Sequence, residues 1–207
     1  MSPWGATTPS KQKLRLEARA RRAGLAAALR DGGGLEAAAE AIAEAVLRFV
    51  PDPARVAVYE SLPDEPPTGR LVERLLAAGH EVIVPVVLAD LSLQWRYAAA
   101  GTAGDRGTVT RRRGPVTAQE RSTWLGTDAL GGCDLVVAPG LSVDPHGTRL
   151  GQGGGCYDRA LVHRDPGAPV IALLHEGEQS VTDLPRDEHD RPVDGVVTTT
   201  GRLVRLR

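Results

Sequence analysis

A glycine-rich segment flanked by arginines is the strongest sign of chemistry in this sequence. From position 149 to 159 the chain reads RLGQGGGCYDR, with glycine at four of the five positions 151–155. Glycines let backbone N–H groups approach a ligand closely, and a helix beginning near Cys156 would direct its positive end toward them. With Arg149 and Arg159 on either side, the segment predicts a loop that binds a phosphate group.

Two familiar phosphate-binding motifs do not fit this spacing. A Walker loop ends in Gly-Lys-Ser or Gly-Lys-Thr, and neither triplet occurs in the chain. The dinucleotide-binding pattern would require glycine at position 156, which is Cys156. The remaining alternative is a tight strand-to-helix connection without a ligand, since glycine is common in turns. The flanking arginines and the Asp158 carboxylate favour the phosphate-binding interpretation.

Other polar positions have simpler explanations. Asp144 opens the tetrapeptide Asp-Pro-His-Gly, whose residue types are those of a type I turn. Cys156 has no base beside it in the sequence, so we expect no thiol nucleophile there. The segment 188–194, EHDRPVD, is rich in acidic residues, but His189 has neither a Cys partner nor a His-Glu-x-x-His spacing for zinc. We interpret this segment as an acid-rich surface turn.

The elements around the glycine-rich segment follow the pattern of an α/β domain. Short apolar runs predict buried strands, and helix-forming segments lie between them. The runs lie at 56–59, 81–87, 135–138, 169–175 and 193–198. This alternation predicts a largely parallel sheet flanked by helices in a Rossmann-like three-layer arrangement, with ligands at the carboxyl ends of the strands. We expect one domain over 1–207, with 1–9 as a frayed tail.

Two N-terminal helices and a marginal strand pair complete the predicted architecture. Ser10 is suited to cap a helix that continues to the glycines at 32–34, and a second helix follows over 35–49. Residues 91–98 and 108–116 predict a pair of strands at the margin of the sheet.

Composition limits the class of partner. The net charge is −1, from 25 basic and 26 acidic residues, so no overall field attracts nucleic acid and a small-molecule partner is favoured. Two cysteines cannot form a disulfide framework, which favours a reducing compartment. No apolar run approaches the roughly 20 residues of a membrane span. We therefore expect a cytoplasmic monomer that binds neither nucleic acid nor membrane.

The segment 137–159, VAPGLSVDPHGTRLGQGGGCYDR, resembles the signature of 5-formyltetrahydrofolate cyclo-ligases, also called methenyltetrahydrofolate synthetases. In that family an apolar strand and Pro-Gly lead to Asp-x-x-Gly-x-Arg-Leu-Gly-x-Gly-x-Gly-aromatic-Tyr-Asp. The segment KQKLR at 11–15 is similar to the Lys-x-x-x-Arg of the family's first helix. One position differs, because Cys156 replaces the usual aromatic residue.

The resemblance implies three groups of site residues. The ATP-binding residues would be Lys11, Gln12, Lys13, Leu14, Arg15, Arg149, Leu150, Gly151, Gln152, Gly153, Gly154, Gly155, Cys156 and Tyr157. Glu65 and the neighbouring candidate Glu60 would contact the folate. Asp158, together with Asp194 in the segment PVDGVVT, would hold Mg²⁺, which prefers oxygen ligands.

The activity implied by the resemblance is ATP- and Mg²⁺-dependent cyclisation of 5-formyltetrahydrofolate to 5,10-methenyltetrahydrofolate, with release of ADP and phosphate. No protein nucleophile is required, because phosphoryl transfer depends mainly on positioning and charge. Two alternatives stay open. One is a non-catalytic folate- or nucleotide-binding relative, and the other is a sugar-phosphate isomerase or CoA-transferase-like enzyme on a similar fold.

Overall fold

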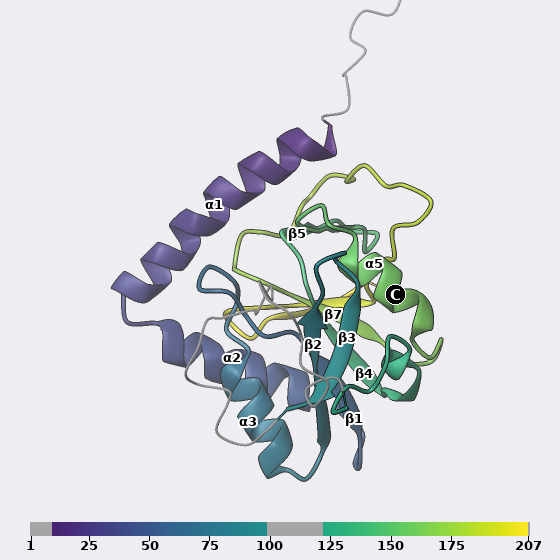
Figure 1. Cartoon of the computed structure of the whole chain (residues 1–207). Helices are drawn as coiled ribbons and strands as arrows, with labels where there is room; N and C mark the ends of the chain where they lie inside the picture. The colour runs from purple at the N-terminus through teal and green to yellow at the C-terminus, as the bar shows by residue number, and fades with distance from the viewer. Residues whose placement is uncertain (1–9, 99–121, 207) are drawn as a thin grey trace, which may run out of the picture.

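A computed structural model describes residues 10–98 and 122–206, which form one α/β domain (Figure 1). Its centre is a seven-stranded sheet with the strand order β3-β2-β1-β4-β7-β8-β9. The frayed tail expected at 1–9 and the strand expected at 108–116 lie outside the described residues.

The helices and strands have the following bounds. The helices are α1 (Lys11–Asp31), α2 (Leu35–Leu47), α3 (Gly69–Ala77) and α5 (Cys156–Ala160), with short 3-10 helices at Ala129–Gly132 and Leu161–His163. The strands of the sheet are β1 (Arg55–Val58), β2 (Glu81–Val87), β3 (Leu93–Tyr97), β4 (Leu135–Pro139), β7 (Val170–Leu174), β8 (Gly195–Thr198) and β9 (Leu203–Arg205). A separate ribbon pairs β5 (Ser142–Val143) with β6 (Arg149–Leu150).

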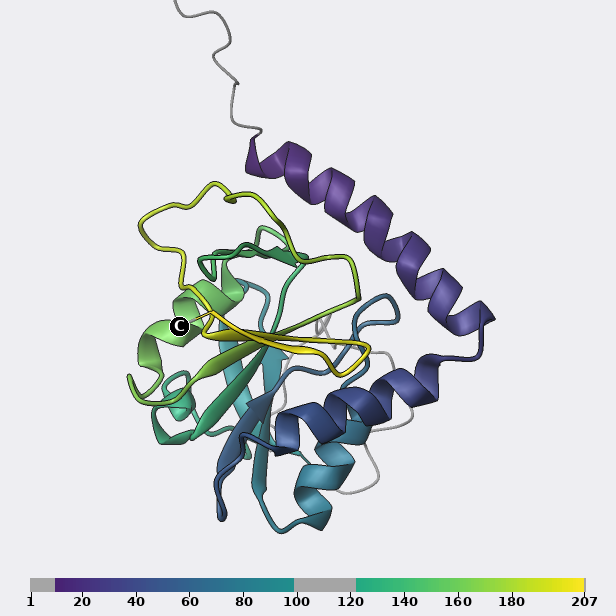
Figure 2. The same ribbon diagram turned by 180° about the vertical axis from the view of Figure 1, so that it is seen from behind.

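The sheet is parallel except at its two edges. Strands β2, β1, β4, β7 and β8 run parallel, whereas β3 and β9 are antiparallel to their neighbours. Helices α2 and α3 cover one face and α5 lies on the other (Figures 1 and 2). All five residues of β7 are buried, which explains why this strand is an unbroken apolar run. The largely parallel three-layer prediction is confirmed.

The connections create a switch point between β1 and β4. From β1 the chain crosses through α3 to β2, and from β4 it crosses through α5 to β7, in the opposite direction along the sheet. Right-handed crossovers in opposite directions place their helices on opposite faces and leave a crevice at the carboxyl ends of the two strands. Ligand sites in open α/β sheets occur at such a crevice.

Helix α1 is long and runs along one side of the edge formed by the carboxyl ends of the strands (Figure 2). Ser10 caps it as predicted, with its Oγ accepting a hydrogen bond from the Lys13 N–H at 3.3 Å. The fully buried positions of α1 are Ala18, Arg22 and Ala26, so the helix lacks a wide apolar stripe. Its attachment therefore depends on polar contacts.

The main polar contact of α1 is a buried ion pair between Arg22 and Glu178. Arg22 Nε and Nη2 each donate to a different Glu178 carboxylate oxygen at 2.7 Å, and Nη2 also donates to the Gly140 carbonyl. The two side chains are 4% and 0% exposed. Glu178 accepts a further hydrogen bond from the His175 N–H. Each charge is thus paired, as burial requires.

We expect Arg22→Met to lower the free energy of unfolding by about 3 kcal/mol, because it leaves the Glu178 carboxylate buried without its counter-charge. Urea denaturation measures this difference. Arg21→Met is the matched control, since Arg21 is exposed and should change stability by less than about 0.5 kcal/mol. Equal losses in the two variants would contradict the role assigned to the ion pair.

Candidate active site

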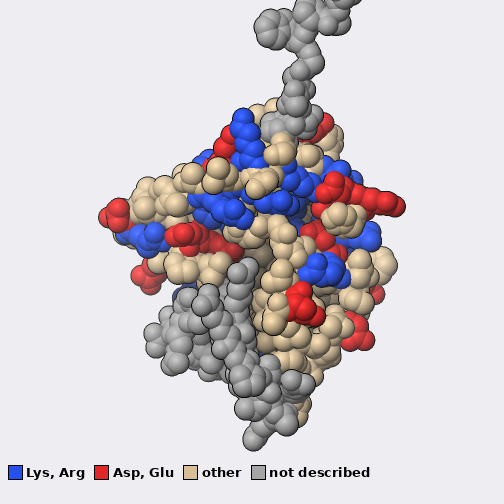
Figure 3. Space-filling view, turned by 45° about the horizontal axis from the view of Figure 1, so that its top comes forward, with Lys and Arg blue, Asp and Glu red and all other residues tan. Residues whose placement is uncertain are grey.

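A cavity of about 240 Å³ opens at the carboxyl ends of β1 and β4. It is lined by Tyr59 and Glu60, which follow β1, by Pro139, which ends β4, and by Gly140, which follows it. Lysine and arginine side chains gather on this face of the molecule (Figure 3). The cavity is therefore at the predicted switch point, on a face where basic and acidic side chains lie close together (Figure 3).

Two opposite kinds of side chain line the cavity. Strands β2 and β3 and the turn between them contribute Pro85, Val87, Leu91 and Leu93, which form an apolar wall. Helix α1 contributes cations. They are Lys11, Arg15 and Arg22. The cavity can thus hold a flat apolar group and an anion next to each other.

The glycine-rich loop 151–155 is bound to α1. Arg15 Nε donates to the Gly151 carbonyl at 3.0 Å, and Arg19 donates to both the side-chain and main-chain oxygens of Gln152 at 2.8 Å. Arg15 and Arg19 are four residues apart and so share a face of the helix. The N-terminal helix and the loop, predicted separately, form one wall of the cavity.

The backbone of this loop has free donors. Gly153 and Gly155 have φ angles of 103° and 64°, a region that side chains disfavour. In the part of the chain that the structure describes, the N–H groups of Gly153, Gly154 and Gly155 donate to no protein acceptor. A Cβ added at Gly154 would lie 3.3 Å from Cys156 Sγ. The loop therefore has the backbone geometry of an anion site, and its ligand stays a prediction.

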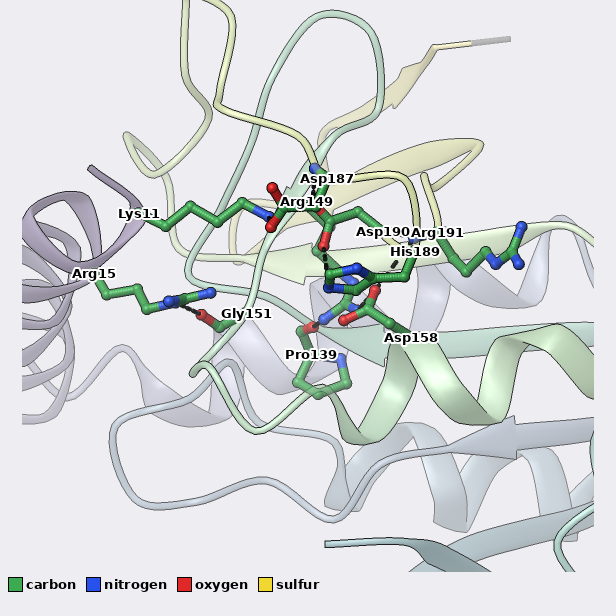
Figure 4. Close-up of polar contacts among 10 residues, drawn as sticks. All are labelled: Lys11, Arg15, Pro139, Arg149, Gly151, Asp158, Asp187, His189, Asp190 and Arg191. Atoms are coloured by element: carbon green, nitrogen blue, oxygen red, sulfur yellow. Dashed lines mark hydrogen bonds and ion pairs between the residues drawn. The ribbon is translucent and has the colours of Figure 1, made fainter. Parts of the chain in front are cut away.

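Arg149 is fixed at the base of the loop. Its Nη2 donates to Asp158 Oδ1 at 2.9 Å and its Nη1 to the Pro139 carbonyl at 3.1 Å (Figure 4). Its guanidinium carbon lies 5.8 Å from the centroid of the Tyr157 ring. Burial raises the pKa of Tyr157 well above its ordinary value, so this phenol stays neutral.

The segment 187–190 forms an exposed turn that also lines the cavity. Lys11 Nζ lies 2.6 Å from Asp187 Oδ2 and also binds Asp190 (Figure 4). Burial alone would lower the pKa of Lys11, but these two carboxylates hold it above its ordinary value. The surface-turn interpretation is confirmed, because the Asp190 N–H donates to the Asp187 carbonyl at 3.1 Å and residues 187–189 are exposed. The contacts with Lys11 join residues more than 170 positions apart and leave no local pattern in the sequence.

The same segment offers ligands for a cation. Within residues 10–98 and 122–206, Asp187, His189 and Asp190 place possible ligand atoms within 4.8 Å of one another. Asp158 lines the same cavity. Carboxylate oxygens are the ligands that Mg²⁺ prefers, so Asp187 and Asp190 are the members of this group that suit that ion.

Asp194 lies elsewhere. Its carboxylate accepts a hydrogen bond from the Val170 N–H at 2.8 Å, at the start of β7. Asp194 directly precedes β8, which is parallel to β7, so it lies at the amino edge of the sheet, whereas the cavity is at the carboxyl edge. The prediction that Asp194 joins Asp158 as a metal ligand is therefore corrected.

The two carboxylates predicted to contact folate both line the cavity. Glu60 accepts a hydrogen bond from Arg96 Nη2 at 2.8 Å. Glu65 is 9% exposed and accepts one from the Leu62 N–H at 3.0 Å. Burial raises the pKa of Glu65, which favours a neutral carboxyl that can both donate and accept hydrogen bonds.

Comparison with known proteins shows the family of the chain. Residues 7–199 match the model of the 5-formyltetrahydrofolate cyclo-ligase family. The chain belongs to this family. The match extends far beyond the glycine-rich segment and confirms the resemblance on which the site residues were predicted.

Relatives of this cyclo-ligase family member agree in sequence and in fold. A Mycolicibacterium smegmatis 5-formyltetrahydrofolate cyclo-ligase is 33% identical over 157 residues, covering 73% of this chain and 77% of that one. A probable 5-formyltetrahydrofolate cyclo-ligase of Caenorhabditis elegans is 28% identical and covers 76% and 80%. The solution structure of Aquifex aeolicus 5,10-methenyltetrahydrofolate synthetase has a TM-score of 0.68 at 24% identity, covering 95% and 93% of the two chains. At this identity it shows the shared fold.

Most residues predicted from the family signature reach the cavity, but not all. Those that line it are Lys11, Arg15, Glu60, Glu65 and every residue from Arg149 to Asp158. Gln12 and Lys13 are exposed on α1, and Leu14 packs in a small apolar cluster with Ala18 and Leu141. Sequence reasoning missed other residues of the cavity. Among them are Arg22, Leu91, Asp187 and Asp190.

Cys156, the departure from the cyclo-ligase signature, lies half-buried in the cavity wall. Its thiol packs against the apolar core and against the glycine-rich loop. It leaves more open space at this position than an aromatic residue would.

No helix in the described parts of this cyclo-ligase family member is long and apolar enough to cross a membrane.

Glu65→Gln should change stability in a pH-dependent way. Because the pKa of Glu65 is raised above its ordinary 4.5, the folded state binds its proton more tightly than the unfolded state does. The contribution of Glu65 to stability is therefore complete below pH 4.5 and is lost as the pH rises through the raised pKa. We expect Glu65→Gln to become progressively more stable relative to the unsubstituted protein above pH 4.5, as measured by urea denaturation between pH 3 and 8.

Asp144→Asn is a control in which the stability difference should depend on pH in the opposite direction. Burial would raise the pKa of Asp144, but hydrogen bonds from the Leu184 and Thr148 N–H groups lower it below its ordinary value. The stabilisation by Asp144 is thus lost as the pH falls. The free energy of unfolding of the Asp144→Asn variant should therefore lie furthest below that of the unsubstituted protein at the higher pH values. A pH-independent difference for Glu65→Gln would contradict the assigned shift.

Proposed function

We propose that this chain catalyses the ATP- and Mg²⁺-dependent cyclisation of 5-formyltetrahydrofolate to 5,10-methenyltetrahydrofolate, with release of ADP and phosphate. One observation carries the proposal. A single cavity has an apolar wall on β2 and β3, a cationic wall on α1, and a loop of free N–H groups next to both. Family membership supplies the identity of the substrates.

The cationic wall and the loop suit a triphosphate. Arg15 lies beside Gly151 and Gly153, and Arg149 lies at the base of the same loop. Guanidinium groups and backbone N–H donors are the usual partners of phosphate oxygens. These groups would neutralise charge on the γ-phosphate as it transfers, which is the main requirement of this reaction.

The proposed reaction has two steps. The formyl oxygen attacks the γ-phosphorus while the bond from that phosphorus to the bridging oxygen of ADP breaks. Nitrogen 10 of the folate then attacks the activated formyl carbon and loses its proton. The bond from that carbon to the phosphate oxygen breaks, and phosphate leaves. Both steps require the folate and the nucleotide to be held side by side, and no side chain serves as a nucleophile.

Mg²⁺ would bind at Asp187 and Asp190, in the cavity that Asp158 also lines. When bound, it supplies positive charge that neutralises the nucleotide phosphates. In the structure, Lys11 neutralises Asp187 and Asp190. We infer that Lys11 exchanges these carboxylates for a phosphate oxygen when the metal–nucleotide complex binds, which reconciles its observed contacts with its predicted role.

The activity itself is tested by incubating the purified protein with 5-formyltetrahydrofolate and Mg-ATP and following the methenyl product by absorbance. We expect product only when both nucleotide and metal are present, and none after addition of EDTA. Binding of the folate without product would favour the non-catalytic relative. Absence of both binding and product would favour an unrelated reaction on a similar fold.

Asp190→Asn should distinguish a metal site that includes Asp190 from the one predicted from the sequence, which includes Asp194. Removal of a ligand carboxylate should lower kcat/KM about 100-fold or more and raise the Mg²⁺ concentration needed for half-maximal rate. Asp194→Asn is the matched control. It should leave kcat/KM within about twofold and lower the free energy of unfolding by about 1 kcal/mol, because it weakens the hydrogen bond to Val170.

The two variants can reverse the assignment. A large loss of turnover in Asp194→Asn, with little loss in Asp190→Asn, would restore the original prediction. Thermal melting of each protein verifies that loss of activity is not loss of fold.

A further inference from the structure

Leu91 is a conformational outlier at the rim of the cavity. Its φ angle is 65°, and among the described residues it is the one non-glycine residue with a positive φ. Leucine disfavours this left-handed region, whereas glycine and asparagine enter it readily. Such outliers persist where the surrounding structure enforces them, and they occur disproportionately at ligand sites.

The turn between β2 and β3 enforces this conformation. The Leu91 N–H donates to the Leu88 carbonyl and the Leu88 N–H to the Ser92 carbonyl, each at 3.0 Å. Asp90 accepts two hydrogen bonds from Ser92. These contacts involve only the backbone of position 91, so glycine would satisfy the turn with less strain. The leucine side chain is thus not required by the turn.

The side chain of Leu91 reaches the glycine-rich loop. Its Cδ1 would lie 3.4 Å from a Cβ added at Gly154, and the residue is half-buried in the cavity wall. Arg159 Nη2 donates to the Leu91 carbonyl at 2.7 Å and so fastens the tip of the turn to α5. The turn is therefore held against the loop with its leucine in the cavity.

We propose that Leu91 is a specificity-determining residue that packs on the ring system of the bound folate. This inference rests on the proposed function. Leu91 belongs to the apolar wall with Val87 and Leu93, whereas the cations that line the same cavity come from α1 and from Arg149. Beside it, Cys156 offers little surface for a flat ring. Leu91 therefore contributes apolar contact to the folate and little to ATP.

The test compares Leu91→Gly with Leu91→Met. Glycine relieves the backbone and removes the contact, whereas methionine keeps an apolar side chain of similar volume. We expect Leu91→Gly to raise the Kd for 5-formyltetrahydrofolate, measured by calorimetry without nucleotide, about tenfold, because most of a buried leucine side chain is lost. Its melting temperature should not fall, and its Kd for ATP should stay within about twofold. Leu91→Met should bind folate within about threefold of the unsubstituted protein.

Three other results would overturn the role proposed for Leu91. An unchanged folate Kd in Leu91→Gly, with normal folate binding and turnover by the unsubstituted protein, overturns the role of Leu91 and leaves the proposed function intact. An equal rise in both dissociation constants together with a lower melting temperature also overturns it, because Leu91 would then only support the loop. If the unsubstituted protein binds no folate, both proposals fail.

Discussion

The cavity depends on the buried ion pair between Arg22 and Glu178. Helix α1 has only two other fully buried residues, both alanines, so apolar burial contributes little to holding it at the sheet edge. The ion pair and the Gly140 carbonyl fix the middle of the helix. Lys11 and Arg15 are carried on the same rigid element and so acquire their positions toward the glycine-rich loop from this anchor.

The cations around the cavity bind groups of the chain itself. Arg15 binds a loop carbonyl, Arg149 binds Asp158, and Lys11 binds two carboxylates. These contacts keep long side chains ordered and prevent strong mutual repulsion between them. A bound anion would therefore compete with internal partners of similar chemistry for the same cations.

Sequence reasoning succeeded where the signal was local. The apolar run of β4, the Ser10 cap and the turn at Asp144 each depend on neighbouring residues, and the structure has all three. It failed where the signal was tertiary. Asp194 and Asp190 are four residues apart in one acidic segment, and only the position of β8 places the first at the far edge and the second at the cavity. Arg22 looked like an ordinary helix charge because its partner lies 156 residues away.

That separation also orders events during synthesis. At about 5–20 residues per second, the ribosome adds Glu178 roughly 8–30 s after Arg22. Until Gly140, Gly151 and Gln152 are added, α1 is a basic helix without the main-chain groups that it binds, although β1, α3 and β2 can already assemble behind it. The carboxylates that pair with Arg22 and Lys11, which are Glu178, Asp187 and Asp190, all lie in the last quarter of the chain. A chain that stops short of Glu178 keeps the loop that Arg15 and Arg19 bind but lacks the carboxylates that pair with Arg22 and Lys11.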